Sequence, residues 1–283
     1  MGQGHTAQGF TLIELSIVLV IIGLIVGGIL VGQDLIKAAE VRAQISQIEK
    51  FNQAVNTFRA KFNAIPGDMA VSTAQQFGFT VGASCAGAQG QRDGNGLIDG
   101  FPNYLLVQGG GETGLFWQDV SSPVAGNLID GQFPNSGGPA INCSGVEFAL
   151  NTTPGTTFLG DYFPVGKIGH GNFIYVYEVN GYNWYALSAV TVVSSSGALA
   201  SNATIPVVQA SNMDKKIDDG LPTTGAVQAM YDNSLGNPPM ANAPNAATDS
   251  TTTCYNTTLN TYSLSSLANY GAGGNCALSF RFQ

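Results

Sequence analysis

The stretch FTLIELSIVLVIIGLIVGGILVG, residues 10–32, decides how this chain folds. It contains one charged side chain, that of Glu14. As an α-helix it would be about 34 Å long, enough to cross the roughly 30 Å hydrocarbon core of a bilayer. The run is too long for the apolar region of an ordinary secretory signal, and no A-x-A cleavage site follows it. We therefore predict a membrane-spanning helix.

This helix is predicted to continue over residues 33–62. Neither glycine nor proline lies between Gly32 and Pro66, and apolar residues recur at helical spacing. The resulting apolar stripe is expected to pack on a sheet rather than to form a coiled coil. It comprises Leu35, Ile36, Val41, Ile45, Ile48, Phe51, Val55, Phe58 and Phe62. Pro66-Gly67-Asp68 is expected to end the helix.

Charge is distributed unevenly along the 283 residues, whose formal net charge is -8. Residues 1–32 contain one charged residue, residues 33–62 contain eight with a net charge of +2, and residues 63–283 carry -9. The acidic balance argues against nucleic acid as the default partner of the whole molecule. The 37 glycines and 12 prolines of the chain favour strands, turns and long loops over a helical bundle.

Glu14 is the unusual residue of the apolar run. A carboxylate inside a spanning helix costs about 2.5–3.5 kcal/mol on insertion scales, so such a residue usually has a functional partner. The alternative is that Glu14 lies near the membrane edge and reaches water. The apolar run by itself leaves both interpretations open.

Residues 9–15, GFTLIEL, followed by the apolar run, resemble the prepilin signature of type IV pilins and pseudopilins. The resemblance implies that a prepilin peptidase cleaves between Gly9 and Phe10 and N-methylates the new Phe10 amine. It also implies that Glu14 meets the Phe10 amine of a neighbouring subunit, so that neither charge is unpaired in an apolar filament core. Identical or related subunits and an inner-membrane assembly platform would then be partners.

The chain departs from that family in two places. Residues 1–9 contain no lysine or arginine, which leaders of this family usually carry, and residues 28–32 contain glycines where many major pilins have a proline. Any partial melting of the helix on assembly would therefore depend on glycine. Because large domains translocate regardless of flanking charge, we expect the head outside the cytoplasm despite Lys37, Arg42 and Lys50.

The head, residues 63–283, is predicted to be α+β. Two runs rich in β-branched and aromatic residues, 173–179 and 182–193, flank Asn180-Gly181, which is typical of a two-residue hairpin turn. Residues 63–165 read mostly as loops. Further elements are predicted as helices near residues 70–77, 114–120 and 207–219 and as a strand at residues 278–282.

The chain contains four cysteines, Cys85, Cys143, Cys254 and Cys276, and no C-x-x-C motif of a zinc or redox site. Four cysteines allow three pairings. We favour Cys85–Cys143 and Cys254–Cys276, because the members of each pair lie in the same loop-rich stretch. The second pair resembles the disulfide loop common near pilin C-termini. Four reduced, buried thiols are the alternative.

Residues 93–99, DGNGLID, place oxygen ligands at alternate positions, an arrangement that suits calcium. The predicted ligands are the side chains of Asp93, Asn95 and Asp99 and the carbonyl of Leu97. The loop is not an EF-hand, because the twelfth position is Tyr104, which cannot supply a bidentate carboxylate. Asx-Gly turns also form without a metal. Some pseudopilins hold calcium in a head loop, and this resemblance adds slightly to the case for a metal, while a metal-free turn stays the alternative.

Signatures of catalysis are scarce. His5 and His170 are the only histidines, and the chain has no G-x-S-x-G elbow for a Ser-His-Asp site. Gly109-Gly110-Gly111 lacks the Lys-Ser/Thr of a P-loop. We interpret residues 214–219 as a solvated helix end. The large aromatic residues are interpreted as core rather than as a binding face: Trp117, Tyr175, Tyr177, Trp184 and Tyr185.

These features predict four segments: a leader (1–9), a transmembrane or filament-core helix (10–32), an amphipathic helix docked on the head (33–62) and a globular α+β head (63–283). The expected architecture is the pilin-like fold, a long N-terminal helix packed on an antiparallel β-sheet head with long loops.

The expected function is that of a structural, non-enzymatic subunit of a type IV pilus-like filament. The alternatives are a minor pilin or pseudopilin of a type II secretion system, a helix-anchored surface adhesin and a membrane-tethered enzyme. The precursor is expected in the inner membrane with its head outside the cytoplasm, and the mature chain in an extracellular or periplasmic filament. Calcium is the one cofactor that the sequence suggests.

Overall fold

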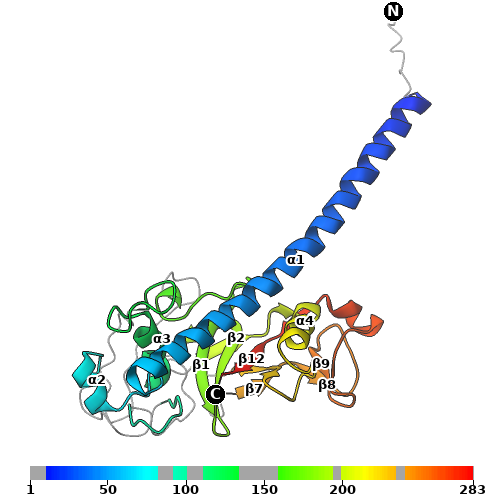
Figure 1. Cartoon of the computed structure of the whole chain (residues 1–283). Helices are drawn as coiled ribbons and strands as arrows, with labels where there is room; N and C mark the ends of the chain where they lie inside the picture. Colours follow the sequence, from blue (N-terminus) through cyan, green and yellow to red (C-terminus); the bar gives the residue numbers. More distant parts are fainter. Residues whose placement is uncertain are drawn as a thin grey trace, which may run out of the picture. The chain divides into compact units, whose positions relative to one another are not determined.

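The computed structural model describes residues 11–81, 92–100, 111–133, 159–193, 199–233 and 240–282. The chain divides into two compact units, residues 1–40 and 41–283. One helix, α1 (Leu12–Phe62), runs through both units (Figure 1). The predicted long N-terminal helix is therefore present.

The first unit contains the apolar part of α1. Every side chain from Leu12 to Val31 is exposed, and an 18-residue window with a mean hydropathy of 2.9 has no buried residue. By length and composition this segment can cross a membrane. A Cβ added at Gly23, Gly27 or Gly28 would meet nothing within 4 Å. Side chains at these three glycine positions would therefore meet nothing in the part of the chain that the structure describes.

The second unit buries one face of α1. That face consists of Val41, Gln44, Ile48, Phe51, Ala54, Val55 and Phe58. The ring of Phe51 lies 4.8 Å from that of Trp117 and 6.0 Å from that of Tyr185, so α1 packs on helix α3 (Glu112–Ser121) as well as on the sheet. The predicted stripe began too early, since Ile36 is 61% exposed. Ile36 precedes Val41 by five positions, which puts the two on different helix faces.

The main sheet has five strands in the order β1-β2-β12-β5, with β3 also paired to β2. Its strands are β1 (Phe173–Val179), β2 (Tyr182–Val193), β3 (Leu199–Asn202), β5 (Val227–Gln228) and β12 (Leu278–Arg281), all antiparallel to their partners. The predicted hairpin is confirmed, because Asn180 and Gly181 have φ angles of 54° and 78°, as a type I′ turn requires. The predicted α+β, pilin-like fold class is likewise confirmed.

The remaining strands are short. They are β4 (Ile205–Pro206), β6 (Met230–Asp232), β7 (Met240–Asn242), β8 (Asn245–Ala246), β9 (Tyr255–Asn256), β10 (Thr261–Tyr262) and β11 (Gly274–Cys276). They form a three-stranded sheet β10-β9-β8 and the pairs β11-β4 and β6-β7. Of these, only β8 and β9 pair in parallel. This region supplements the main sheet with small local ladders.

Three further α-helices and two 3₁₀ turns complete the described elements. They are α2 (Val71–Phe77), α3 (Glu112–Ser121), α4 (Val207–Ile217), η1 (Leu159–Asp161) and η2 (Ser266–Gly271). Helix α4 ends two residues earlier than predicted. Asp218 leaves the helical conformation, and its carboxylate accepts hydrogen bonds from the amides of Ala226 and Val227 instead.

The acidic end of α4 is less solvated than predicted. Asp214 is buried and accepts a hydrogen bond of 2.8 Å from the Tyr262 hydroxyl, while Asp219 is exposed. Asp214 follows Ala210 by one helical turn and so shares its buried face. The interpretation of residues 214–219 as a solvated helix end is therefore wrong for Asp214.

Aromatic residues dominate the core. The five residues interpreted as core are at most 4% exposed: Trp117, Tyr175, Tyr177, Trp184 and Tyr185. Tyr185 stacks on Phe282 at 4.2 Å between ring centres and joins α3 to the sheet through Trp117. The core interpretation of these aromatic residues is thus confirmed.

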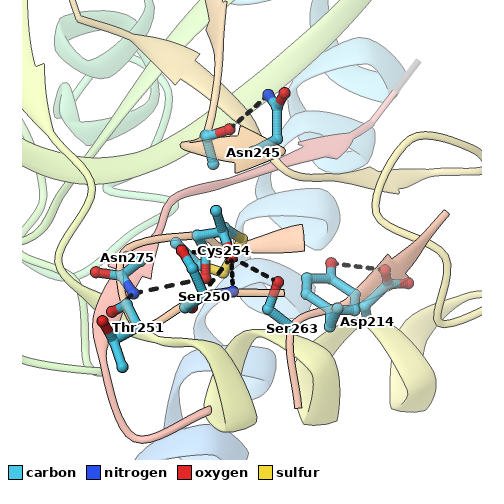
Figure 2. Close-up of a disulfide and its surroundings, with 11 residues drawn as sticks. Asp214, Asn245, Ser250, Thr251, Cys254, Ser263 and Asn275 are labelled. Carbon is cyan, nitrogen blue, oxygen red and sulfur yellow. Dashed lines mark hydrogen bonds between the residues drawn. A yellow bond between two sulfur atoms is a disulfide. The ribbon is translucent and has the colours of Figure 1, made fainter. Parts of the chain in front are cut away.

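A disulfide joins Cys254 and Cys276, as predicted (Figure 2). Both cysteines are fully buried, and their Cα atoms lie 4.9 Å apart. Hydrogen bonds surround the bridge: the Cys254 amide donates to the Pro244 carbonyl (2.6 Å), and the Asn275 side chain donates to the Thr251 carbonyl (2.8 Å). The disulfide thus holds β11 to the segment before β9. Cys85 and Cys143 lie outside the described residues.

Replacing Cys254 and Cys276 together by serine is expected to lower the free energy of unfolding of the head by about 3 kcal/mol. The bridge spans 22 residues, and its loss frees the unfolded chain accordingly. Urea unfolding of the full chain in detergent, followed by tryptophan fluorescence, measures the change. The exposed Ser266→Ala substitution is the control. Equal midpoints for the double variant and the control would contradict the prediction.

Candidate functional site

The first candidate site is the N-terminal end of α1. Gly9 and Phe10, the predicted cleavage and methylation positions, lie outside the described residues. Glu14 lies in the first turn of the helix. Its Oε2 accepts hydrogen bonds from the Thr11 amide and the Thr11 hydroxyl, both at 2.8 Å. The Glu14 amide donates to the Thr11 hydroxyl at 3.3 Å in return.

This reciprocal pattern is a capping box, in which Thr11 precedes the helix and Glu14 is its third residue. It provides partners for two amides at the start of the helix and places a carboxylate at the positive end of the helix dipole. This partner of Glu14 differs from the two expected from the sequence, which are water and a neighbouring subunit. The T-x-x-E spacing ahead of an apolar run is the signal that indicates the intramolecular partner.

The second candidate site is a carboxylate cluster in the head. One oxygen each from Asp68, Asp93 and Glu112 lie within 4.8 Å of one another. Asp68 follows the turn that ends α1, Asp93 opens the loop of residues 93–99, and Glu112 begins α3. Asp68 and Glu112 are buried, and Asp93 is half-buried. Three segments far apart in the sequence therefore bring acidic groups together.

Backbone amides of the loop bind two of these carboxylates. Asp68 accepts from the amides of Gly94 (2.8 Å) and Gly96 (2.7 Å). Glu112 accepts from the amides of Asp93 (3.2 Å) and Asp99 (3.0 Å). The loop is thus folded around the side chains of residues outside it.

The predicted calcium ligands are only partly gathered at this cluster. Asp93 belongs to it. The Asn95 amide nitrogen Nδ2 donates to both Asp93 (3.0 Å) and Asp99 (3.2 Å), and Asn95 Oδ1 accepts from the Leu97 amide (2.7 Å). Asp68 and Glu112 were not predicted. Their separation in the sequence gives no spacing signal, and the sequence pattern at Asp68 indicates only the end of the helix.

Burial and mutual repulsion raise the pKa values of these acids. Loss of hydration raises the pKa of Asp68 to about 7. Loss of hydration, with the negative charges of Asp68 and Asp93, raises the pKa of Glu112 to about 9. Three carboxylates at this distance cannot all be ionised without a compensating cation. The cluster therefore binds protons or a cation. Of its three acids, Asp68 also lines a pocket of about 290 Å³ together with Arg59.

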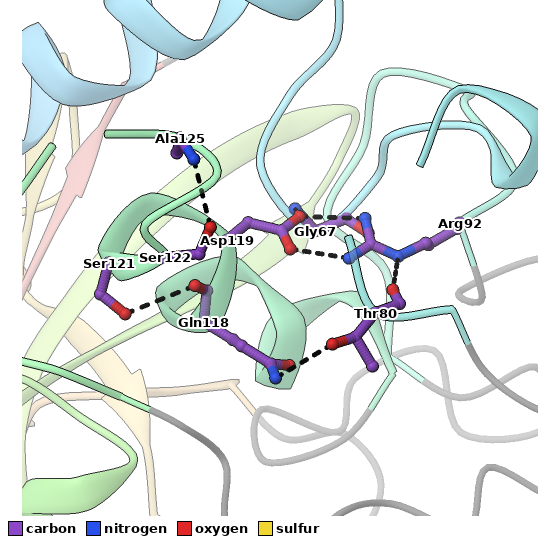
Figure 3. A network of polar contacts seen from close by, with 8 residues as sticks. All are labelled: Gly67, Thr80, Arg92, Gln118, Asp119, Ser121, Ser122 and Ala125. Carbon is purple, nitrogen blue, oxygen red and sulfur yellow. Dashed lines mark hydrogen bonds and ion pairs between the residues drawn. The ribbon is translucent and has the colours of Figure 1, made fainter. Parts of the chain in front are cut away.

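A buried ion pair holds this region in place (Figure 3). The Arg92 guanidinium, 1% exposed, binds both carboxylate oxygens of Asp119 at 2.9 and 2.7 Å, and its Nε donates to the Thr80 carbonyl at 2.7 Å. Asp119 also accepts from the Gly67 amide at 2.8 Å. Since Arg92 adjoins Asp93 and Gly67 adjoins Asp68, this network positions two of the three clustered carboxylates.

Gly67 allows the turn to approach α3. Its φ of +84° lies in the left-handed region, and a Cβ there would overlap the carbonyl oxygen of Glu112. The glycine of Pro66-Gly67-Asp68 therefore ends the long helix and also allows Asp68 to approach Glu112.

Asp119→Ala is expected to lower the free energy of unfolding of the head by about 3–5 kcal/mol. The substitution leaves the Arg92 guanidinium buried without its counter-ion, and breaking a buried pair from one side is costly. Urea unfolding of the full chain, followed by tryptophan fluorescence, measures the loss. Asp130→Ala on the exposed surface is the matched control. A loss no larger than that of the control would refute the assigned role.

Without a divalent cation, the head is expected to become less stable as pH rises from 5 to 9. The folded state retains protons on Asp68 and Glu112 that the unfolded state releases above about pH 4, so unfolding is increasingly favoured up to the folded pKa values near 7 and 9. If the cluster binds calcium, adding calcium at pH 8 raises the melting temperature. Thermal melts with calcium or with chelator test both points.

Glu112→Gln is expected to flatten the pH dependence and to reduce the effect of calcium. Asp161→Asn removes an exposed carboxylate and serves as the control for net charge. An identical melting temperature with calcium and with chelator would count against a metal at this cluster. The change of melting temperature between pH 5 and 9 tests separately whether Asp68 and Glu112 retain protons. Calcium binding itself stays a prediction.

Comparison with known proteins bears on the first site. A family model described as a prokaryotic N-terminal methylation motif matches residues 5–30, a range that includes Thr11, Glu14 and most of the apolar run. No curated protein and no solved structure matches the chain significantly. The motif is that of a structural, pilin-type family rather than an enzyme class. With the long apolar helix and the antiparallel sheet, it supports the recognition of this chain as type IV pilin-like or pseudopilin-like.

Proposed function

We propose that this protein is a structural subunit of a type IV pilus-like filament. One observation carries the proposal: the methylation motif at residues 5–30 continues into a helix whose side chains from Leu12 to Val31 are all exposed. Water cannot accommodate such an apolar surface at low cost. Lipid covers it in the precursor, and the helices of neighbouring subunits cover it in the filament.

Processing and pairing follow from the same motif. A prepilin peptidase cleaves between Gly9 and Phe10 and methylates the Phe10 amine. The Glu14 carboxylate then pairs with the Phe10 amine of a neighbouring subunit, which sets the register between helices and leaves neither charge alone in an apolar core. Identical or related subunits and an inner-membrane assembly platform are the partners.

The four predicted segments have separate roles in this proposal. Residues 1–9 are removed, and residues 10–32 form the membrane anchor and later the filament core. Residues 33–62 continue the helix, whose part from Val41 onward packs within the head. The head lies outside the cytoplasm in the precursor and on the outer surface of the filament. The buried disulfide between Cys254 and Cys276 supports an oxidising compartment.

A minor pilin or a pseudopilin of a type II secretion system is the alternative within the same class. It would share the motif, the helix and the head outside the cytoplasm. A helix-anchored adhesin would need the anchor but no assembly, so loss of filaments would leave its surface display and its ligand binding intact.

Filament formation tests the proposal directly. We expect electron microscopy of purified surface filaments to show this chain as a component, with an N-terminal sequence that begins at Phe10. Glu14→Ala is expected to abolish filaments while the head remains displayed, because the carboxylate partner is lost. Glu49→Ala, an exposed position further along α1, is the control. Normal filaments with Glu14→Ala would refute the subunit assignment.

A further inference from the structure

A groove runs along one side of α1, and none of its lining residues belongs to either candidate site. It has a volume of about 700 Å³ and lies between the helix, residues 127–133 and residues 164–167. On α1 the lining positions recur every three or four residues from Ala43 to Thr57, so they form one stripe about 21 Å long. The described part of the chain leaves this groove open.

The groove combines buried aromatic rings with exposed apolar and polar groups. Phe51 of α1 and Phe133 are each 6% exposed, whereas Val165 is 55% exposed. Ser46 and Asn127 add a hydroxyl and an amide that water reaches. An apolar centre with a polar rim is typical of a surface that contacts another protein.

Two lysines from distant segments line this groove. Lys50 is on α1 and Lys167 is on the segment before β1, and both are exposed. Among the described residues neither side-chain amine has a hydrogen bond or an ion pair, and Asp130 is the one acid that lines the groove. The head, residues 63–283, contains five lysines and arginines against 14 acids. The groove is therefore cationic on an otherwise acidic molecule.

Hydrogen bonds fix the segment that carries Lys167. Gln47 donates from Nε2 to the Val165 carbonyl at 2.9 Å, and its Oε1 accepts from the Lys167 amide at 3.0 Å. Gln44, about one turn earlier on α1, accepts from the Ile168 amide at 3.0 Å. The backbone on both sides of the groove is thus in place before a partner binds, which reduces the entropy lost on binding.

We propose that this groove docks an extended acidic segment from the head of a second copy of this chain, and that Lys50 and Lys167 are its cationic contacts. At about 3.3 Å per residue, an extended segment of about six residues matches the length of the stripe on α1. The proposal rests on the filament function and adds to it a surface through which the heads meet.

Charge complementarity selects this occupant. The head has a formal charge of -9, and some of its acids are exposed. Asp219 is an example: among the described residues its carboxylate accepts only from the Leu221 amide (2.8 Å) and the Thr224 hydroxyl (2.7 Å). A neighbouring head therefore supplies the counter-charge that Lys50 and Lys167 lack among the described residues of their own chain. Attraction of this kind also orients the partners as they meet.

Charge reversal tests these contacts in the full chain. Lys50→Glu combined with Lys167→Glu is expected to lower filament yield about tenfold, because two attractions become repulsions. Lys215→Glu combined with Lys216→Glu changes the net charge equally at exposed positions of α4 and is the matched control, expected to stay within about twofold of the wild-type yield. Lys50→Arg combined with Lys167→Arg keeps both charges and is expected to retain the wild-type yield.

Melting temperatures separate docking from folding. Both groove lysines are exposed, and the bond from the Lys167 amide to Gln47 does not involve the lysine side chain. The purified full-length Lys50→Glu, Lys167→Glu variant in detergent is therefore expected to melt at the wild-type temperature. A melting temperature that falls together with the filament yield would overturn the docking role, because the loss would then be one of folding.

Cross-linking identifies the segment that occupies the groove. A zero-length carbodiimide joins an amine to a carboxylate only where the two touch. Treated filaments are separated on a denaturing gel, and the joined peptides of the covalent dimers are sequenced. We expect these dimers to contain Lys50 or Lys167 joined to an acid of residues 63–283. Links of these lysines that occur only within single chains would assign the groove to the chain's own acids and overturn the proposal.

Filament yield and cross-linking also distinguish docking from the filament function. An unchanged yield with the groove variant, or an equal loss with the control, overturns docking while the filament function stands. If the wild-type chain forms no filaments, the proposed function fails. Docking is then decided by the dimers that carbodiimide forms from the full chain in its membrane: groove lysines in these dimers support it, and their absence overturns it.

Discussion

The rest of the structure depends on one constraint, the removal from water of the apolar surface between Leu12 and Val31. Among the described residues, nothing covers this surface, whereas the same helix buries one face from Val41 onward. The boundary lies where the spacing of apolar residues changes, since only the later positions repeat on one face. The chain thus contains one helix with two kinds of surface: the first part is apolar and exposed, and the second part packs on the head.

Several charged side chains of the head are buried. It is poor in charged residues, yet Asp68, Arg92, Glu112, Asp119 and Asp214 are all buried. The formal charge of -9 for residues 63–283 therefore overstates the charge on the surface at neutral pH, because the raised pKa values of Asp68 and Glu112 mean that protons or a bound cation offset part of it. An acidic composition here does not mean an equally acidic surface, which matters where copies of the head are packed side by side.

Local patterns predicted the local elements well. The spanning run, the helical stripe and the turn at Asn180-Gly181 each carry their signal within a few residues, and α1 and the hairpin agree with it. The carboxylate cluster could not be found in this way. Asp68 and Glu112 lie far from the loop of residues 93–99 in the sequence, and the ion pair between Arg92 and Asp119 that joins these segments is visible only in the fold.

No lysine or arginine lies near Glu14 in the sequence to balance its charge. The first lysine or arginine of the sequence is Lys37, 23 positions after Glu14, or about 34 Å along a helix. Thr11 supplies hydrogen bonds to the carboxylate but no positive charge. In the head, the raised pKa values of Asp68 and Glu112 reduce the negative charge at neutral pH. Arg92 balances the charge of Asp119. At Glu14 neither solution is available from a side chain of the helix, which is why the proposed function assigns its counter-charge to the amine of a cleaved neighbouring chain.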